Sequence, residues 1–550
     1  MSKKKQPIPP QPGSVEEKLH EISTGLVAKG QFVEALRQLM VLAADNVTNA
    51  QLWMLIGNVY ARIANWSDAL GALDTAIVLD PLQWQAHRIK ALALFSLGRR
   101  REACTLIDKV VKHSNESGDW MLRAYIHAHT SSDPMIALQT ARDWGKRFAD
   151  PLTRIAKPLK IQDRNPRKKL KIGYVTADFR EHSVAFFMLP VLSHHNPDNV
   201  EIHVYSNGPW DHITPQLRVL VPHWLDIMEM SDEDVCKQIR EDQIDILVDL
   251  SGFTQGHRLG VFARRAAPVQ VTWLGYMLPL GMKAMDYRLV DAGIAPPSHA
   301  PYYSESLFYL EAMACYAPPT YAPLCEEPPM LRNGYPTLIS LNSSGKITDE
   351  MLRVWAKILH EREDARLIIL VKEDSADAAQ AHMQPRVEAA GMPLERVSVL
   401  HQQSLRQFME LGHIADIALD TSPISGGTTT LHTLWMGMPV VTLDGVRGVE
   451  SSTAGLLRGL GFGGEIEQNL QGYVAAALSL MDRKSYLLEF RKSIREQLRC
   501  SWVMDYVNRT ADLEKAFRLM WLNYLHEDRK ALHFSADLEA LLSEMDAAAA

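Results

Sequence analysis

Small and large apolar residues recur in the first third of the chain with a fixed period. Ala35, Ala69 and Ala103 are spaced 34 residues apart, which is typical of stacked pairs of antiparallel helices. The middle copy is the clearest, with small residues that let two helices approach and large ones that fill the space between them: Trp53, Ile56, Gly57, Tyr60, Ala69, Leu73, Ala76 and Pro81. The pattern predicts helical hairpins.

The flanking copies keep mainly the turn between the two helices. Gly30 precedes Ala35 and Gly98 precedes Ala103, and a weaker fourth copy contains Ala137 on the same period. We predict tetratricopeptide-like helical repeats over residues 16–150, after a disordered N-terminus at 1–15. An ordinary helical bundle is the alternative. Stacked repeats usually present a groove to a peptide or partner protein.

From residue 170 onward, short β-branched runs alternate with helical stretches. The first set lies at 170–175, 202–205, 244–250, 269–273 and 287–290, and the second at 337–341, 366–371, 397–400, 414–419 and 439–443. This alternation predicts an α/β fold with two doubly wound parallel sheets. Two such halves in tandem imply a cleft between them.

Polar and proline-rich stretches set the predicted domain boundaries. We expect a linker at 151–169, an N-terminal Rossmann-like domain at 170–317 and an interdomain linker at 318–336. A C-terminal Rossmann-like domain at 337–500 follows. The aromatic-rich residues 501–550 are expected to form C-terminal helices that cover one half.

Composition excludes several classes of protein. The 550 residues include 47% hydrophobic and 22% charged ones, as in ordinary folded proteins. Because 58 basic residues face 65 acidic ones, for a net charge of −7, no bulk cationic field is available to hold nucleic acid or an anionic membrane. We therefore expect neither as a partner.

The cysteines and apolar runs bear on location. The five cysteines form no Cys-x-x-Cys pair, so neither a zinc cluster nor a redox dithiol is indicated, and a reducing compartment fits best. No apolar stretch approaches the roughly 20 residues needed to span a bilayer. The first residues lack the apolar run of a secretory signal. We expect a cytoplasmic protein.

The strongest local signal for chemistry is a glycine- and threonine-rich turn. Residues 420–430 follow a predicted strand and lead into an apolar helix. Gly426 and Gly427 permit close approach of the backbone, while Thr428 and Thr429 add hydroxyl donors at a helix start that favours an anion. The turn therefore predicts a phosphate site, and a plain capped connection is the alternative. Neither half carries Gly-x-Gly-x-x-Gly after its first strand, and no P-loop is present.

Two further candidates follow the first strand of each half. Lys346 lies just past the strand at 337–341, where it could neutralise a diphosphate, although a solvated surface lysine is the alternative. His182 follows the strand at 170–175 and could accept a proton near neutral pH. A histidine that merely caps a helix would look the same in sequence.

Four segments in order carry a resemblance to a known family. They are GYVTADFREHS at 173–183, DILVDLSG at 245–252, APVQVTWLGY at 267–276 and GGTTT at 426–430. Behind tetratricopeptide-like repeats, this series resembles the O-linked N-acetylglucosamine transferase family, glycosyltransferase family 41, and looks like a bacterial member. The resemblance covers about residues 16–525.

The resemblance implies a fold and an activity. The fold is GT-B, in which two Rossmann-like domains face a cleft. The activity is an inverting, metal-independent transfer of a sugar, N-acetylglucosamine or a hexose, from a UDP-sugar to Ser/Thr or Asn of a polypeptide. The nucleotide sugar is then a substrate and no cofactor is expected. The repeats would recruit the protein or peptide acceptor, and a homo-oligomer is left open.

The resemblance also assigns roles to residues. His182 and Lys346 are the catalytic candidates. The predicted donor-binding residues are Asn342, Ser343, Lys346, Gln403, Gly426, Gly427, Thr428, Thr429 and His432, and the predicted acceptor-side residues are Asp249, Gly252, Phe253 and Thr254. No metal ligand is expected, because the literal Asp-x-Asp at 232–234 precedes an amphipathic stretch and is interpreted as a helix cap.

The sequence departs from the family pattern around the expected pocket. His432 stands where a carboxylate usually meets the ribose, and Phe253 stands in place of the histidine of Gly-His-Thr. The turn after Tyr276 and the segment at 450–452 also differ. Two alternatives follow: a nucleotide-binding scaffold without turnover, or the same enzyme class with another donor, such as GDP-fucose.

Overall fold

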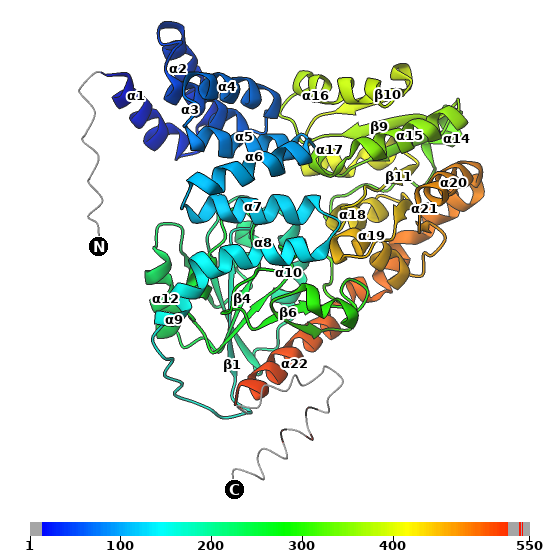
Figure 1. Cartoon of the computed structure of the whole chain (residues 1–550). Coiled ribbons are helices and arrows are strands. Elements are labelled where there is room, and N and C mark those ends of the chain that lie inside the picture. The colour runs from blue at the N-terminus through cyan, green and yellow to red at the C-terminus, as the bar shows by residue number, and fades with distance from the viewer. Residues whose placement is uncertain (1–13, 526–537, 539, 541, 543–550) are drawn as a thin grey trace. The chain divides into compact units, whose positions relative to one another are not determined.

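The computed structural model describes residues 14–525, 538, 540 and 542 (Figure 1). The predicted N-terminal tail therefore lies almost wholly outside the described residues, as does most of 526–550. The chain divides into two compact units. The first comprises Met1–Ile126, Leu341–Ala356 and Leu367–Gln403, and the second comprises His127–Ser340, Lys357–Arg366 and Ser404–Ala550. Among the described residues, no helix has the length and apolar character needed to cross a bilayer.

The first part of the chain is all helical, as the repeat predicts. Its helices are α1 (Val15–Glu21), α2 (Phe32–Asp45), α3 (Ala50–Arg62), α4 (Trp66–Leu79), α5 (Trp84–Ser96), α6 (Arg100–His113), α7 (Ser117–Thr130), α8 (Pro134–Trp144) and α9 (Asp150–Ile155). Two π-helical turns, η1 (Ile22–Val27) and η2 (Gly145–Ala149), continue α1 and α8.

The 34-residue period has a simple structural cause. Ala35, Ala69, Ala103 and Ala137 are each the fourth residue of α2, α4, α6 and α8 and are at most 2% exposed. A methyl side chain at this position lets the second helix of each hairpin approach its neighbour closely. The predicted helical repeats are confirmed.

The first sheet has seven parallel strands in the order β3-β2-β1-β4-β5-β6-β7. The strands are β1 (Leu170–Thr176), β2 (Val200–Ser206), β3 (His223–Asp226), β4 (Ile246–Asp249), β5 (Val269–Thr272), β6 (Tyr287–Val290) and β7 (Ser306–Tyr309). Between them lie α10 (Ser183–His194), α11 (Thr214–Arg218), α12 (Asp232–Glu241), α13 (Leu259–Ala263) and η3 (Pro297–Tyr302).

The C-terminal helix α22 (Tyr506–Leu525) belongs to the core of this first sheet. Phe517 and Trp521 are fully buried in the same apolar cluster as Ile172 and Val248 of the central strands. In Figure 1, α22 runs beside β1 and β6. Helix α22 therefore packs on the first sheet, and the extent predicted for the C-terminal helices, 501–550, stays a prediction.

The second sheet has the strand order β10-β9-β8-β11-β12-β13. Its strands are β8 (Thr337–Ser340), β9 (Arg366–Leu370), β10 (Val397–Leu400), β11 (Ile417–Leu419), β12 (Val440–Leu443) and β13 (Ile466–Glu467). The helices of this half are α14 (Pro329–Asn333), α15 (Asp349–Glu361), α16 (Ala376–Ala389), α17 (Leu405–Met409), α18 (Thr428–Trp435), α19 (Gly448–Gly459), α20 (Leu470–Asp482) and α21 (Lys484–Arg499). Short 3-10 turns are η4 (Ser344–Lys346), η5 (Leu394–Arg396), η6 (Leu411–His413) and η7 (Trp502–Met504).

The two sheets confirm the predicted α/β class and correct some details. The strands β3, β7 and β13 were not predicted, and each lies at the edge of its sheet. An edge strand is covered on fewer sides than a central one, so its sequence is less continuously apolar. The strand predicted from residue 414 begins only at Ile417, because Ile414 is 44% exposed at the end of η6.

Candidate functional site

Each sheet has a point at which the strand order reverses direction. In the first sheet the chain passes outward from β1 through β2 to β3, then returns to β4 on the other side of β1. In the second sheet β8 is followed by β9 and β10 on one side and by β11 on the other. Ligands of doubly wound sheets bind beyond the carboxyl ends of the strands at such switch points.

The predicted motifs follow the four strands that flank these two points. The segment with His182 follows β1, and Gly252–Thr254 follow β4. Lys346 follows β8, and Gly426–Thr429 follow β11. Strands β8 and β11 are parallel neighbours, so both loops leave the same edge of the second sheet.

Buried hydrogen bonds fix the turn after β11. The Asp420 carboxylate accepts the Gly426 N–H at 2.9 Å and the Thr442 hydroxyl at 2.8 Å, while the Tyr473 hydroxyl donates to the Asp420 carbonyl. A Cβ at Gly426 would lie 2.4 Å from the Thr430 hydroxyl oxygen, so only glycine fits. The turn is therefore preorganised.

The start of α18 is suited to an anion. Gly427 is its N-cap, and among the described residues no side chain makes the capping hydrogen bond. The first amides of a helix have no partner within the helix, and the helix dipole is positive at this end. Thr428 and Thr429 are half-buried in this first turn. This geometry agrees with the predicted phosphate site.

His432 is a buried residue of α18. His432 is 6% exposed, and its Nδ1 is hydrogen-bonded to the Tyr316 hydroxyl at 2.5 Å. Burial lowers the pKa of His432 to about 3, so the ring is neutral. The ribose contact of His432 stays a prediction, and in this structure the side chain is enclosed by aromatic rings.

The surroundings of His432 instead join the two sheets within the second unit. Phe186 of α10 meets the ring edge-on at a centroid distance of 5.0 Å. Phe186 is one turn into α10 and His432 is one turn into α18. The helices that begin at the two switch points therefore pack against each other close to their N-termini.

His182 is the N-cap of α10 and lies beside a buried carboxyl group. Its Nδ1 accepts the Val184 N–H at 3.3 Å and lies 3.6 Å from Asp178 Oδ1. Asp178 is 3% exposed, and Oδ2 has no hydrogen-bond partner among the described residues. Burial raises the pKa of Asp178 to about 6, an effect that Arg180 opposes and Asp249 reinforces. Sequence reasoning missed Asp178 as a site residue, although it stands four positions before His182.

The predicted acceptor-side residues form a closed turn after β4. Asp249 is 1% exposed, and its carboxylate accepts N–H groups from Ser251 and Gly252 and the Thr272 hydroxyl. Burial raises the pKa of Asp249, and these donors oppose the rise. Gly252 has a φ of +56°, and a Cβ there would lie 2.3 Å from the Cβ of Tyr276. Asp249 therefore shapes the turn.

Phe253 and Thr254 complete this turn. Phe253 is 6% exposed and packs between Trp144, edge-on at 5.1 Å, and Tyr276 at 5.3 Å. Thr254 donates its hydroxyl to the Ser251 carbonyl at 2.7 Å. An aromatic ring in place of the family's histidine thus fills an apolar space, and the acceptor-side role of Phe253 stays a prediction.

The loop that carries Lys346 is held by the helical repeats of its own unit. Buried Arg100, the first residue of α6, donates from Nε to the Gly345 carbonyl at 2.9 Å. The Ser344 hydroxyl donates to the Ser96 carbonyl at 3.2 Å. Sequence reasoning missed this role of Arg100, because a contact across 245 positions leaves no local signal.

The other predicted donor residues of this unit are near Lys346 or on the loop after β10. Lys346 is half-buried, and its Nζ lies 3.5 Å from the Asn342 side-chain oxygen. Asn342 is buried and Ser343 is exposed. Gln403 is half-buried and donates to the His401 carbonyl at 3.0 Å.

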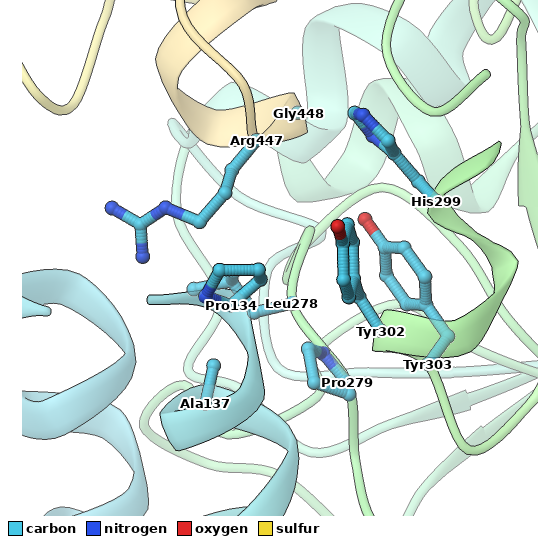
Figure 2. Close-up of a pocket in the computed structure, with 9 residues that line it drawn as sticks. All are labelled: Pro134, Ala137, Leu278, Pro279, His299, Tyr302, Tyr303, Arg447 and Gly448. Atoms are coloured by element: carbon cyan, nitrogen blue, oxygen red, sulfur yellow. The ribbon is translucent and has the colours of Figure 1, made fainter. Parts of the chain in front are cut away.

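The cavity in Figure 2 lies apart from the predicted site residues. It is lined by Pro134, Ala137, Leu278, Pro279, His299, Tyr302, Tyr303, Arg447 and Gly448. Its volume of about 10 Å³ holds about one water molecule. Arg447 donates from Nη1 to the Ala128 carbonyl at 2.9 Å and from Nε to Glu450 at 2.8 Å. The cavity is too small for a sugar nucleotide.

The literal Asp-x-Asp motif lies at a helix start. Ser231 is the N-cap of α12, and Asp232 and Asp234 lie in the first turn, where acidic side chains favour the dipole. Asp232 also pairs with buried Arg258 at 2.7 Å. These contacts agree with the interpretation as a capping segment.

Comparison with known families gives the same result as the topology. The model of glycosyl transferase family 41 matches residues 153–316 and 337–513. The chain belongs to this family. A solved O-GlcNAc transferase of Thermobaculum terrenum, in mutant form, is 31% identical with a TM-score of 0.86 and covers 93% of this chain and 98% of its own. This member of family 41 therefore has the GT-B fold preceded by helical repeats.

Several curated relatives of this family 41 chain are plant proteins. A probable UDP-N-acetylglucosamine–peptide N-acetylglucosaminyltransferase SPINDLY from Solanum lycopersicum is 34% identical over 77% of this chain and 46% of its own length. Its counterpart from Oryza sativa subsp. japonica is 36% identical over 78% and 47%. The chain thus spans about half the length of these relatives.

Proposed function

We propose that this chain is an inverting protein glycosyltransferase that uses a UDP-sugar. The donor would be UDP-N-acetylglucosamine or a UDP-hexose, and the acceptor Ser/Thr or Asn of a polypeptide. The observation that carries the proposal is the placement of the predicted motifs at the two switch points: Lys346 and the α18 start in one sheet, and His182 with Asp178 in the other. The names of the relatives support the choice of donor.

The donor half would stabilise the leaving group. As the acceptor attacks the anomeric carbon, the bond to the diphosphate breaks and negative charge grows on the phosphate oxygens. The Lys346 ammonium and the first amides of α18, which have no partner within the helix, would stabilise that growing charge. No metal ion is needed for this role.

The other half offers a group that can take the acceptor proton. A neutral imidazole carries one proton, on either Nδ1 or Nε2. When Nδ1 of His182 accepts the Val184 N–H, that proton is on Nε2, and Nε2 cannot then accept the acceptor's proton. An ionised Asp178, 3.6 Å from Nδ1, favours the tautomer with the proton on Nδ1, which makes Nε2 basic. We therefore assign His182 as the base and Asp178 as its positioning residue.

Acceptor recruitment and location complete the proposal. The helical repeats would hold the acceptor polypeptide, as stacked repeats commonly do. All five cysteines are free, which supports a reducing compartment such as the cytoplasm. A homo-oligomer remains a prediction without a contact to support it.

The experiment that tests the proposal measures binding and transfer separately. Purified protein is titrated calorimetrically with UDP, GDP and their sugar conjugates, and a host extract is then incubated with the donor that binds. UDP binding with a hexose- or hexosamine-sized mass gain on acceptor proteins supports the proposal. Preferential binding of GDP would instead indicate a donor such as GDP-fucose.

A scaffold without turnover is the second proposed function. It is favoured by the burial of His432 and Phe253, which stand where the family offers groups to ligands. UDP binding without transfer to any protein of the extract, or to a peptide library rich in Ser, Thr and Asn, would support it. No nucleotide binding at all would contradict both functions.

A further inference from the structure

A cluster of metal-ligating side chains lies at the β3 edge of the first sheet, outside the transferase site. It consists of Glu201 and His203 on β2 and His223 on β3, and we name it the edge cluster. Side chains two positions apart on a strand point to the same face, so Glu201 and His203 share one face of β2. His223 is the register partner of His203 on the neighbouring strand.

The three ligand atoms converge on one point. Glu201 Oε1 lies 2.9 Å from His203 Nε2 and 3.3 Å from His223 Nε2. All three atoms lie within 4.8 Å of one another. Two ligands about 2.1 Å from a tetrahedral zinc ion lie about 3.4 Å apart, so the observed spacings need only small adjustments.

The two imidazole rings are also oriented together. Their centroids are 4.2 Å apart, and the planes are inclined by 16°. Stacked rings on neighbouring strands direct both Nε2 atoms toward the same carboxylate oxygen. Neither ring has to turn around to share an ion.

The exposure of the three side chains increases from the sheet toward the solvent. The His203 side chain is 9% exposed, Glu201 28% and His223 51%. An ion can therefore reach the cluster, while its inner ligand is fixed by packing. Lys171 on β1 has its Nζ 3.6 Å from Glu201 Oε1 and also donates to the Asp242 carbonyl at 3.1 Å. Lys171 can keep its hydrogen bond to the Asp242 carbonyl when the Glu201 side chain rotates toward an ion.

We propose that the edge cluster binds one divalent transition-metal ion of the zinc type. Two imidazoles and one carboxylate suit Zn²⁺ and leave a fourth position for water. The ion would tie the four-residue edge strand β3 to β2, where the main chain of an edge otherwise has hydrogen-bonding partners on one side only. Its role is structural, and the proposed sugar transfer does not depend on it.

The test uses the full chain stripped of metal with a chelator. ZnCl₂ is titrated calorimetrically, and Co²⁺ is added in a parallel sample because tetrahedral Co²⁺ absorbs strongly in the visible range. We expect one ion per chain, the tetrahedral spectrum and a higher unfolding temperature with Zn²⁺.

Two variants and a matched control assign the ion to these residues. His223→Ala removes the exposed ligand, and Glu201→Gln keeps the shape of the side chain. Each should weaken Zn²⁺ binding at least tenfold and abolish the thermal shift. His212→Ala removes a histidine that is 64% exposed and pairs with Glu181, and it should change nothing.

Two results would overturn the proposal. One is the absence of Zn²⁺ binding by the unaltered protein, and the other is unchanged binding by His223→Ala, which would place the ion elsewhere. If sugar transfer is absent while Zn²⁺ binds as expected, only the proposed function is affected.

Discussion

Burial changes two titratable side chains near the switch points in opposite directions. Loss of water disfavours whichever form is charged, so the pKa of the Asp178 carboxyl rises to about 6 and that of the His432 imidazole falls to about 3. Near neutral pH His432 is therefore a neutral hydrogen-bonding partner of Tyr316, whereas Asp178 changes its charge within the range in which enzymes are usually assayed. The two groups are suited to different roles: His432 to packing and Asp178 to proton chemistry.

Asp178 gives a pH-dependent prediction for stability. Because the pKa is higher in the folded chain than the ordinary 3.8, the folded state holds the proton more tightly, and stability falls as pH rises through about 4 to 6. Asp178→Asn removes this loss, so above pH 6 it should be the more stable protein by up to about 3 kcal/mol, at 1.36 kcal/mol per pKa unit. Below about pH 3, under both pKa values, the difference should be close to zero. Denaturant unfolding at several pH values measures it.

A carboxylate on the surface provides the control for this experiment. Asp198 is exposed, and Asp198→Asn should leave the pH dependence of unfolding unchanged. If Asp178→Asn and the unaltered protein have the same free energy of unfolding at every pH, burial of Asp178 does not destabilise the folded chain as expected.

Lys346 gives a prediction for the chemical step. Lys346→Ala should lower the rate of sugar transfer by about 10²–10³-fold, as loss of one electrostatic group at a developing charge does in other enzymes, and it should weaken UDP binding. Initial rates and calorimetry measure the two effects. Lys357→Ala, which removes a 56% exposed lysine of α15, should leave both unchanged. Full activity of Lys346→Ala would contradict the diphosphate assignment.

At the scale of elements, the turn between α5 and α6 supports the loop between β8 and α15. A Cβ at Gly345 would lie 3.3 Å from the Phe95 carbonyl, and His382 of α16 contacts the Leu97 carbonyl at 3.3 Å. The amide of Trp66, at the start of α4, donates to the fully buried Glu373 carboxylate. The repeats in this unit thus have a structural role in addition to the proposed recruitment of acceptors.

Arg100 is the residue through which this support can be tested. Arg100→Ala removes a charged donor from the Gly345 carbonyl, next to Lys346. A hydrogen bond to a charged group contributes about 1.5–3 kcal/mol, so the KM for the donor should rise about tenfold or more while kcat changes less. Steady-state kinetics separate the two, and hydrogen exchange should quicken in residues 341–347.

The next residue in the chain serves as a matched control. Arg101 has the same side chain and is exposed on α6, so Arg101→Ala should leave KM unchanged. Equal effects of the two substitutions would mean that the repeats influence the donor through general charge and not through the loop.

At the scale of the whole molecule, contacts between α10 and α18 connect the two sheets within the second unit. Tyr316, from the segment between the sheets, is 1% exposed and hydrogen-bonded to His432, while Phe186 packs on both rings. The Tyr316 amide also donates to the Val503 carbonyl at 2.8 Å, which joins this segment to the C-terminal helices. The relative position of the two helix N-termini depends on this aromatic cluster.

Tyr316→Phe tests the cluster with little change of shape. It leaves the buried Nδ1 of His432 without its hydrogen-bond partner, which costs about 1–3 kcal/mol of folding stability, and sugar transfer should fall with it. Chemical denaturation and initial rates measure both. Tyr321→Phe, at a 38% exposed ring, should change stability by less than about 0.5 kcal/mol. An unaltered stability of Tyr316→Phe would show that the hydrogen bond contributes nothing.

Much of the fold could be predicted from local pattern. The buried strands β1, β4 and β5 are nearly continuous apolar runs because both faces of a doubly wound sheet are covered. The edge strands β3 and β7 were missed because exposed positions interrupt their apolar pattern, and β13 was missed because it has only two residues. The motifs after β1, β4, β8 and β11 were found for a related reason: ligand-binding residues of such sheets follow the strands directly.

The sequence by itself determined the helical repeats, the two parallel sheets and the positions of the motifs along the chain. Each depends on a short-range periodicity, 34 residues for the hairpins and alternation of strand and helix for the sheets. Only the tertiary structure decided that His432 and Phe253 are buried, that Asp178 lies beside His182 with a raised pKa, and that Arg100 holds the Lys346 loop. Burial, pKa and contacts between distant segments depend on which side chains lie together in the folded chain, and a local sequence pattern does not specify this.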